Sequence, residues 1–143
     1  MLKKITSFFL AATLCLTVWT IPVSAASLSK DIGIVTPFFL NYTSYCMSCI
    51  SIVNGTAECT SLASGYQNET TKIYIEQTLQ RRGTYGWVNE QTWTSTTYSY
   101  YASLSNYKYN VTSGTYRVKS FFKVYSGTDY ETITTYSSES TVS

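Results

Sequence analysis

The chain has 143 residues, with 10 Lys and Arg against 8 Asp and Glu, and a formal net charge of +2. It contains no histidine, which excludes Ser-His-Asp and Cys-His hydrolases and zinc sites that need an imidazole ligand. After the first 25 residues the chain is rich in Ser, Thr, Tyr, Val and Ile, a composition that favours strands over helices.

Residues 1–25 have the three-part pattern of a cleavable secretory signal. Lys3 and Lys4 precede an apolar run from Ile5 to Trp19, and small residues occupy the −3 and −1 positions of a cleavage site after Ala25. The run is shorter than the roughly 20 apolar residues of a bilayer-spanning helix, which argues against a membrane anchor. We therefore expect a secreted, extracellular protein whose mature chain does not insert into a membrane.

Loss of Lys3 and Lys4 with the signal leaves Lys and Arg equal in number to Asp and Glu. A chain without a basic surplus has little overall attraction for polyanions. We therefore expect neither nucleic acid nor anionic lipid as a partner.

Residues 26–41 are interpreted as an extended leader whose apolar part lies along one edge of the domain, and residues 42–143 as the domain itself. In the domain, alternating polar and apolar segments are separated by turn signals at the spacing typical of a β-sandwich. Short links between strands imply antiparallel pairing and two packed sheets. The predicted fold class is all-β, a seven-stranded antiparallel immunoglobulin-like β-sandwich, with strands at residues 42–53, 56–66, 71–80, 87–93, 98–109, 115–125 and 130–136.

Four asparagines, Asn41, Asn54, Asn68 and Asn110, begin Asn-x-Thr sequences. We interpret them as turn residues rather than as glycosylation sites, and Asn54-Gly55 in particular predicts a two-residue hairpin loop.

Three cysteines follow the signal. Cys46 and Cys49 have the spacing of a redox or metal motif, but a separation of three on a strand sends their side chains to opposite faces. Because export favours oxidation, we expect a disulfide between Cys59 and either Cys46 or Cys49. The Asn54-Gly55 loop places Cys59 opposite Ile50, which leaves the choice of partner open, and the third thiol is expected to be buried rather than available for cross-linking. No metal site and no cofactor are predicted.

Gly114-Thr-Tyr116-Arg-Val118 matches the pattern near the start of the sixth strand of immunoglobulin-like domains, where the tyrosine hydroxyl bonds back to the preceding corner. A simple buried tyrosine is the alternative. Both interpretations give Tyr116 and Gly114 a structural role.

Aromatic side chains concentrate between residues 87 and 109. Trp87 and Trp93 are separated by an even number of residues and are predicted to point the same way. An exposed aromatic surface of this kind would stack on sugar rings, whereas in the alternative interpretation alternate members fill the core. The candidate binding residues are Trp87, Trp93, Tyr98, Tyr101, Tyr107 and Tyr109.

One further pattern extends over nearly the whole region from Tyr42 to Tyr136. The chain resembles an uncharacterised family of short secreted all-β proteins from Gram-positive anaerobic bacteria. The resemblance is carried by the stretches 71–82, 86–87, 113–119 and 124–127, together with Trp93 and Glu131-Thr132. The resemblance implies an exported β-domain and supplies no catalytic residues.

The predicted function is that of a non-enzymatic extracellular module that binds an unknown protein or glycan. The carboxylates are scattered and show no facing pair of the kind a glycosidase needs. The alternative is a carbohydrate-binding module, or a small glycan-active protein, that uses the surface aromatics.

Overall fold

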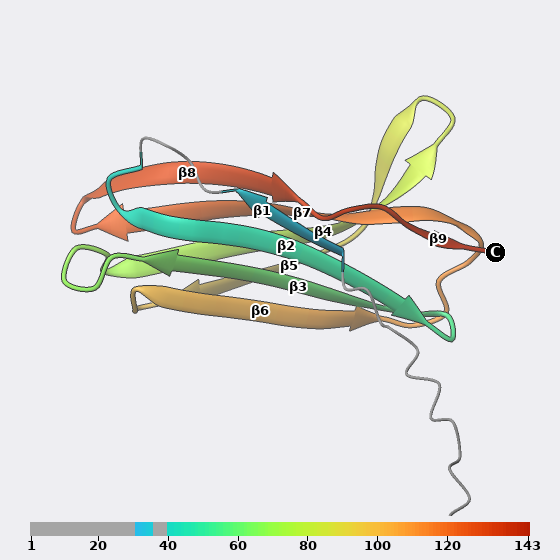
Figure 1. Ribbon diagram of the computed structural model, residues 1–143, viewed down its shortest axis with the longest axis horizontal. Coiled ribbons are helices and arrows are strands. Elements are labelled where there is room, and N and C mark those ends of the chain that lie inside the picture. The colour runs from blue at the N-terminus through green and yellow to red at the C-terminus, as the bar shows by residue number, and fades with distance from the viewer. Residues whose placement is uncertain (1–30, 36–39) are drawn as a thin grey trace, which may run out of the picture.

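The computed structural model describes residues 31–35 and 40–143, and shows two antiparallel β-sheets packed face to face around a shared core (Figure 1). The described residues form strands and turns. The strands are β1 (Asp31–Val35), β2 (Thr43–Val53), β3 (Thr56–Gly65), β4 (Lys72–Gly83), β5 (Gly86–Thr97), β6 (Tyr101–Lys108), β7 (Gly114–Ser126), β8 (Asp129–Tyr136) and β9 (Ser140–Val142).

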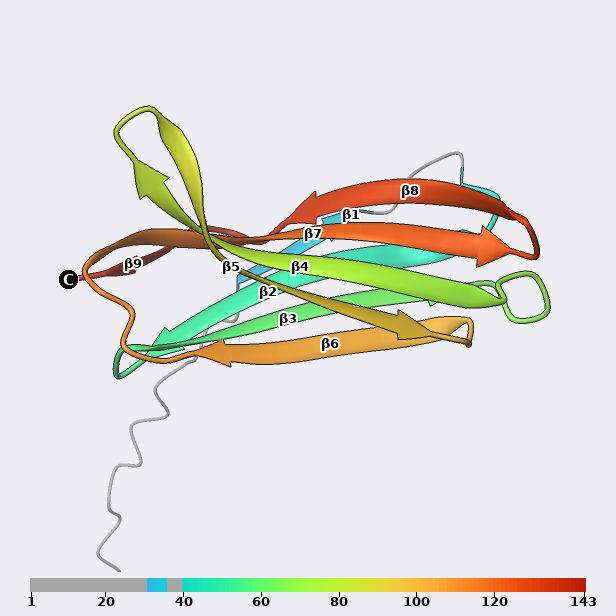
Figure 2. The same ribbon diagram turned by 180° about the vertical axis from the view of Figure 1, so that it is seen from behind.

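The first sheet has the order β1-β2-β3-β6, and the second has the order β5-β4-β7-β8, with β9 pairing β7 beyond the end of β8. The hairpins β2–β3, β4–β5 and β7–β8 each stay within one sheet. The links β3–β4, β5–β6 and β6–β7 cross from one sheet to the other. Seen from behind, the edge strands β5 and β6 lie on the same side of the domain (Figure 2).

The all-β, two-sheet prediction is confirmed, and the seven predicted strands correspond to β2 through β8. Two further strands lie outside them. β1 falls in the expected leader and pairs with the edge of β2, and β9 falls in the polar tail. The predicted signal segment, residues 1–25, lies outside the described residues.

Asparagines close several of the turns. Asn54, Asn68 and Asn110 have positive φ angles of 49°, 78° and 57°, a conformation that asparagine tolerates better than most residues. Asn54 and Gly55 both have positive φ, as a two-residue hairpin loop requires. The interpretation of these three asparagines as turn residues is confirmed.

The core consists of two apolar clusters, one toward each end of the domain. Buried side chains alternate along the central strands, as the period of two predicts. The first cluster contains Cys46, Ala63, Ile73, Ile75, Ala102, Phe122, Val124 and Ile133. The second contains Ile50, Ala57, Cys59, Leu79, Tyr116 and Val118.

A buried polar layer separates the two clusters. Gln77 lies on β4 between Ile75 of the first cluster and Leu79 of the second, and Ser120 lies between Phe122 and Val118 on β7 in the same way. Each is fully buried, and such groups are tolerated in a core only when they are hydrogen bonded.

The hydrogen bonds of this layer join both sheets. Gln77 Nε2 donates to Ser61 Oγ at 2.7 Å and to the Leu104 carbonyl at 3.0 Å, and Asn106 Nδ2 donates to Gln77 Oε1 at 3.0 Å. The hydroxyl of Ser120 contacts Ser48 Oγ at 2.6 Å and Ser61 Oγ at 2.7 Å. The layer therefore fixes the register of one sheet over the other.

The disulfide expectation is wrong. Among the described residues, no disulfide joins Cys59 to Cys46 or to Cys49. Cys59 pairs with Ile50, whereas Cys46 pairs with Ala63, four residues further along β3. That offset is about 13 Å along a strand, and a disulfide needs Cα atoms within about 7 Å. Cys49 is the neighbour of Ile50 and points to the opposite face, so neither pairing has the required geometry.

Candidate binding surface on the second sheet

A β-bulge in β5 determines which aromatic side chains face the core. Gln91 pairs with Leu79 and Asn89 pairs with Gln80, so Glu90 is an extra residue in β5. An extra residue reverses the alternation of side chains beyond it. Trp93 packs against the second apolar cluster, whereas Trp87 lies on the outer face of the sheet. The prediction that the two tryptophans point the same way is therefore wrong.

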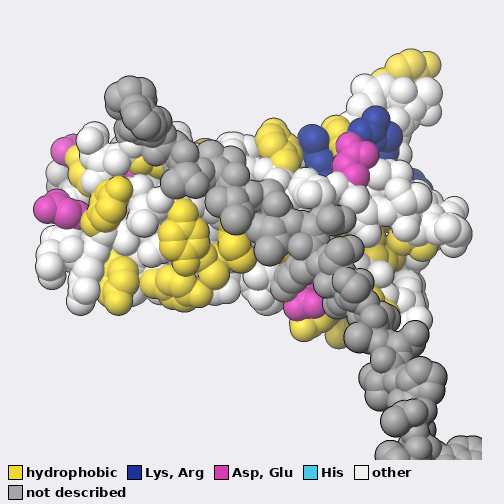
Figure 3. Space-filling model, viewed as in Figure 1, with side chains coloured by type: hydrophobic (Ala, Val, Ile, Leu, Met, Phe, Trp, Pro, Cys, Tyr) yellow, Lys and Arg dark blue, Asp and Glu magenta, His cyan; other side chains and the backbone are white. Residues whose placement is uncertain are grey.

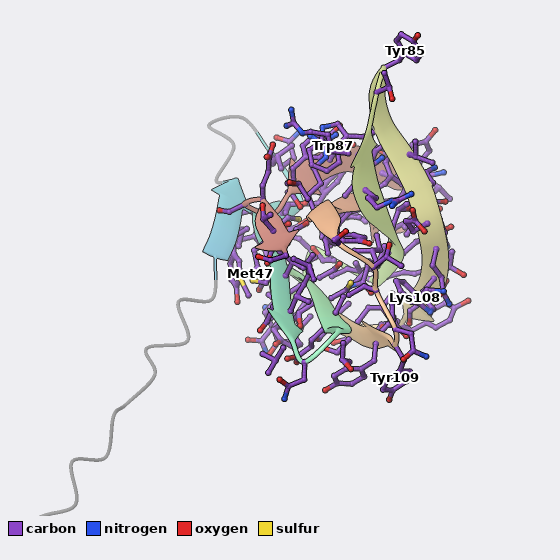
Figure 4. The ribbon with its side chains drawn as sticks, turned by 90° about the vertical axis from the view of Figure 1, so that its right-hand side faces the viewer. Met47, Tyr85, Trp87, Lys108 and Tyr109 are labelled. Atoms are coloured by element: carbon purple, nitrogen blue, oxygen red, sulfur yellow. The ribbon has the colours of Figure 1, made fainter. Side chains whose placement is uncertain are left out.

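Beyond the bulge, β4 and β5 continue as a two-stranded arm that projects from the domain (Figure 1). The predicted strands 71–80 and 87–93 left residues 81–86 as the link between them, but pairing extends through Arg81↔Val88 and Arg82↔Trp87 to Gly83↔Gly86. The strands continue because the arm has its own anchors on the domain. Tyr85 lies at the tip of the arm (Figure 4) and is fully exposed.

The arm is anchored by a cation–aromatic cluster at its base. The guanidinium carbon Cζ of Arg117 lies 4.1 Å from the ring centroid of Trp87 and 4.3 Å from that of Tyr136. Arg82 Cζ lies 4.8 Å from the Trp87 ring, and Arg82 Nη2 forms an ion pair with Glu139 Oε1 at 2.5 Å. Contacts of this type join strands β4, β5, β7 and β8 on one face.

Arg117 is further fixed by a hydrogen bond within the sheet. Its Nε donates to Gln80 Oε1 at 2.9 Å, and Gln80 Nε2 in turn donates to Asn89 Oδ1 at 2.8 Å. Burial lowers the pKa of the Arg117 guanidinium from its ordinary value, but an arginine remains protonated in proteins. The site therefore holds a fixed positive charge.

A second cation–aromatic cluster lies at the other end of the same face. Lys72 Nζ lies 3.7 Å from the Tyr125 ring centroid, and Lys123 Nζ lies 3.6 Å from that of Tyr130 and 5.1 Å from that of Tyr125. The two tyrosine rings are in contact, with centroids 5.6 Å apart. Both ammonium groups are thus held against aromatic rings at the sheet surface.

The two clusters make the outer face of the second sheet predominantly basic. The side chains that point outward from β4 and β7 include five cations and one carboxylate, Glu76. A second carboxylate, Glu139, comes from the segment before β9. Basic side chains gather at the base of the arm beside an acidic one in the space-filling view (Figure 3). We call this the basic face, and its charged residues are Lys72, Glu76, Arg82, Arg117, Lys119, Lys123 and Glu139.

The predicted aromatic residues do not form one surface. Tyr101 and Tyr107 lie on the outer side of the edge strand β6, about 20 Å apart at the spacing of a strand. Tyr98 lies in the loop between β5 and β6. Tyr107 and Tyr109 are stacked, with ring centroids 6.4 Å apart. Tyr109 lies on the opposite side of the domain from Trp87 (Figure 4).

Tyr116 is buried in the second apolar cluster. Its hydroxyl donates to the Thr112 carbonyl at 2.8 Å, in the segment that enters β7. Gly114 precedes it with a φ of 148°, where an added Cβ would lie 3.3 Å from Arg81 Cδ. Both residues therefore shape the corner between β6 and β7.

Two of the thiols are buried, and one carboxylate is held by backbone groups. Burial raises the pKa of Cys46 and of Cys59 to about 12, with a smaller contribution from Glu131 and Glu58 respectively. Glu131 accepts the backbone N–H groups of Asn41 and Tyr42 at 3.0 Å each. Within residues 31–35 and 40–143, no group of three or more His, Cys, Asp or Glu is arranged to hold a metal ion.

Sequence reasoning missed the basic face, although part of its signal is visible. Arg117, Lys119 and Lys123 have the same parity in one strand, which places them on one side of a sheet. The other side chains of the face come from β4, β5 and β8. Which strands lie beside β7 is decided by the tertiary fold and cannot be seen in the sequence of β7 alone.

No family model, curated protein or solved structure matches the chain. In the part of the chain that the structure describes, there is no helix long and apolar enough to cross a membrane.

Proposed function

We propose that the chain is an exported, non-enzymatic binding module of immunoglobulin-like architecture, and that it binds an extracellular partner through the basic face. The observation that carries the proposal is the pair of cation–aromatic clusters, in which the charges of Arg117, Lys72 and Lys123 are held against aromatic rings on one sheet surface. Side chains ordered in this way lose less conformational entropy on binding than free lysines or arginines do.

The immunoglobulin-like assignment is supported by the connections between the sheets. β2, β3 and β6 are adjacent in one sheet and β5, β4, β7 and β8 in the other, with the chain crossing at β3–β4, β5–β6 and β6–β7. The hydrogen bond from Tyr116 to Thr112 is the type of corner contact found in such domains. The family resemblance to short secreted proteins of Gram-positive anaerobes remains part of this proposal, as does export through residues 1–25.

A binding role is supported over catalysis by the state of the reactive groups. The thiols of Cys46 and Cys59 are buried, and their raised pKa values keep them protonated at neutral pH. Glu90 is paired with Arg81 at 3.0 Å, and Glu139 with Arg82. These carboxylates act as partners of arginines on the arm and at its base.

The carbohydrate alternative through aromatic stacking has less support, because Trp93 packs in the core and Trp87 is in contact with two arginines. Recognition through charge is favoured instead.

Two measurements test the proposal. Residues 1–25 fused to a reporter that is active only outside the cytoplasm are expected to give activity, and a reporter that stays inactive would contradict export. The purified chain is expected to cosediment with washed cell envelopes of the organism that encodes it.

The cosedimentation experiment has a matched pair of variants. Lys119→Glu/Lys123→Glu places two negative charges on the basic face and is expected to abolish binding. Lys108→Glu changes a lysine on β6, in the other sheet, and is expected to bind as the unchanged chain does. No cosedimentation, or equal loss in both variants, would contradict the proposed binding surface.

A further inference from the structure

We propose that the ligand of the basic face is a linear anionic polysaccharide that lies along β7. This inference rests on the proposed function, because it names the chemistry of the partner that the face binds.

The first argument is the uneven distribution of charge. The basic face carries the cations Lys72, Arg117, Lys119 and Lys123. In the described part of the chain, the only ion pairs are those of Arg81 with Glu90 and of Arg82 with Glu139. These four cations therefore form no ion pair, although Glu139 acts electrostatically on Arg117, and the face as a whole carries five cations against the carboxylates of Glu76 and Glu139. Residues 26–143 have equal numbers of basic and acidic side chains, yet they present a positive surface on this face. Such a surface attracts polyanions when they approach within a Debye length, about 10 Å at 0.1 M salt.

The second argument is the linear arrangement of the cations. Arg117, Lys119 and Lys123 share one side of a single strand, and alternate residues of a strand are about 6.6 Å apart. The three charges therefore span about 20 Å along β7. A row of this length fits a chain that bears a negative group on successive repeats better than it fits a single small anion.

The third argument is the chemistry on both sides of the row. Thr92, Thr94 and Thr96 on β5 are exposed and have the outward parity, and Thr132 and Thr134 have it on β8. These hydroxyls can donate and accept hydrogen bonds. Charged groups flanked by hydroxyls match a ligand that combines anions with many hydroxyl groups, as an acidic polysaccharide does.

The aromatic rings distinguish this ligand from a single-stranded nucleic acid. Nucleic acids of that kind bind by stacking bases on free ring faces. On the basic face the rings of Trp87, Tyr125, Tyr130 and Tyr136 are instead in contact with arginine or lysine side chains. The rings position the cations, and the cations face the ligand.

The test is affinity electrophoresis of the purified chain through gels that contain defined polymers. Dextran sulfate is compared with dextran, and polygalacturonate with its methyl-esterified form, so that each anionic polymer has a neutral counterpart. We expect retardation by at least one anionic polymer, none by either neutral one, and weaker retardation as salt is added. Poly-L-glutamate and single-stranded DNA are included as the other polyanions.

Variants assign the effect to the basic face. Lys119→Gln/Lys123→Gln is expected to weaken binding by about tenfold or more, because two charge-assisted contacts are lost. Lys119→Arg/Lys123→Arg keeps both charges and is expected to retain binding, and Lys108→Gln is the matched control on the other sheet. Unfolding temperatures of all variants are measured, so that a folding defect is recognised.

Retardation by neutral and anionic polymers alike, or by none of the four polysaccharides, would overturn the inference. Tighter binding of poly-L-glutamate or DNA than of either anionic polysaccharide would also overturn it, in favour of that other class of ligand. Cosedimentation with cell envelopes that persists in any of these cases would leave the proposed function intact with a different ligand.

Discussion

The guanidinium carbon of Arg117 lies 4.1 Å from the ring centroid of Trp87, and this contact joins the centre of the second sheet to the projecting arm. The arm has a fully exposed tyrosine at its tip, and an isolated two-stranded hairpin is only marginally stable in water. Contacts at its base must therefore hold it in place. The same contacts fix a positive charge on the basic face, so arm and binding surface share one set of side chains.

Arg117→Ala is expected to loosen the arm while leaving the two sheets folded. The substitution removes the contacts of the guanidinium with Trp87 and Tyr136 and its hydrogen bond to Gln80. Amide hydrogen exchange of residues 81–88 is expected to accelerate by about tenfold or more, which corresponds to a local loss of at least about 1.4 kcal/mol. Lys119→Ala, on the same strand, is the control. Equal exchange in both variants would show that Arg117 does not anchor the arm.

The two tryptophans are expected to differ in their contribution to global stability. Trp93 packs against the second apolar cluster, so Trp93→Ala is expected to reduce the free energy of unfolding by about 3 kcal/mol. Trp87→Ala removes an outer-face ring and is expected to cost about 1 kcal/mol. Urea unfolding of both variants measures the difference. The opposite order would mean that the bulge at Glu90 does not reverse the alternation of side chains.

The side-chain amide of Gln77 in the buried polar layer is expected to contribute to the free energy of unfolding. Gln77→Met keeps the side-chain length but removes the partner of Ser61, the Leu104 carbonyl and Asn106. The unpaired groups are expected to lower the free energy of unfolding by about 2–4 kcal/mol. Gln91→Met, a partly buried position on the edge strand β5, is the matched control and is expected to change it by less than about 1 kcal/mol. A neutral effect of Gln77→Met would show that the layer adds no stability.

The buried thiols predict a loss of stability at alkaline pH. In the folded chain the pKa of Cys46 and Cys59 is raised to about 12, from an ordinary value of 9.0. Above pH 9 the unfolded chain therefore releases these protons while the folded chain keeps them, which favours unfolding. Below pH 9 both states are protonated and the effect is absent.

Between pH 9 and 12 each thiol is expected to lower the free energy of unfolding by up to about 1.4 kcal/mol per pH unit. Urea midpoints at pH 8, 9 and 10 measure this loss. Because tyrosines and lysines titrate in the same range, the decisive comparison is with Cys59→Ala, whose stability should fall less steeply. Parallel curves for the two proteins would contradict a raised thiol pKa.

Sequence reasoning predicted the all-β, two-sheet architecture because alternation and turn chemistry are local. The period of two in residues 115–125 and the Asn54-Gly55 loop each depend on residues close in the chain, and both hold in the structure. The loop also gave the pairing of Cys59 with Ile50.

The errors arose where one residue or one distant pairing decides the outcome. The bulge at Glu90 has no strong local signal, yet it places Trp87 and Trp93 on opposite faces. The disulfide was expected from the compartment alone, whereas the distance between Cys46 and Cys59 follows from the register. The basic face depends on the pairing of β7 with β4 and β8. The alternation of residues within one strand does not predict which strands lie beside it.

The central claim, that the outer face of the second sheet binds an anionic polysaccharide, is tested most directly by nuclear magnetic resonance on the isotopically labelled chain. Spectra are recorded with and without dextran sulfate. The account predicts that shift changes concentrate on Lys72, Arg117, Lys119 and Lys123 and on the exposed threonines of β5 and β8. Changes confined to Tyr101, Tyr107 and Tyr109, or no changes at all, would contradict it.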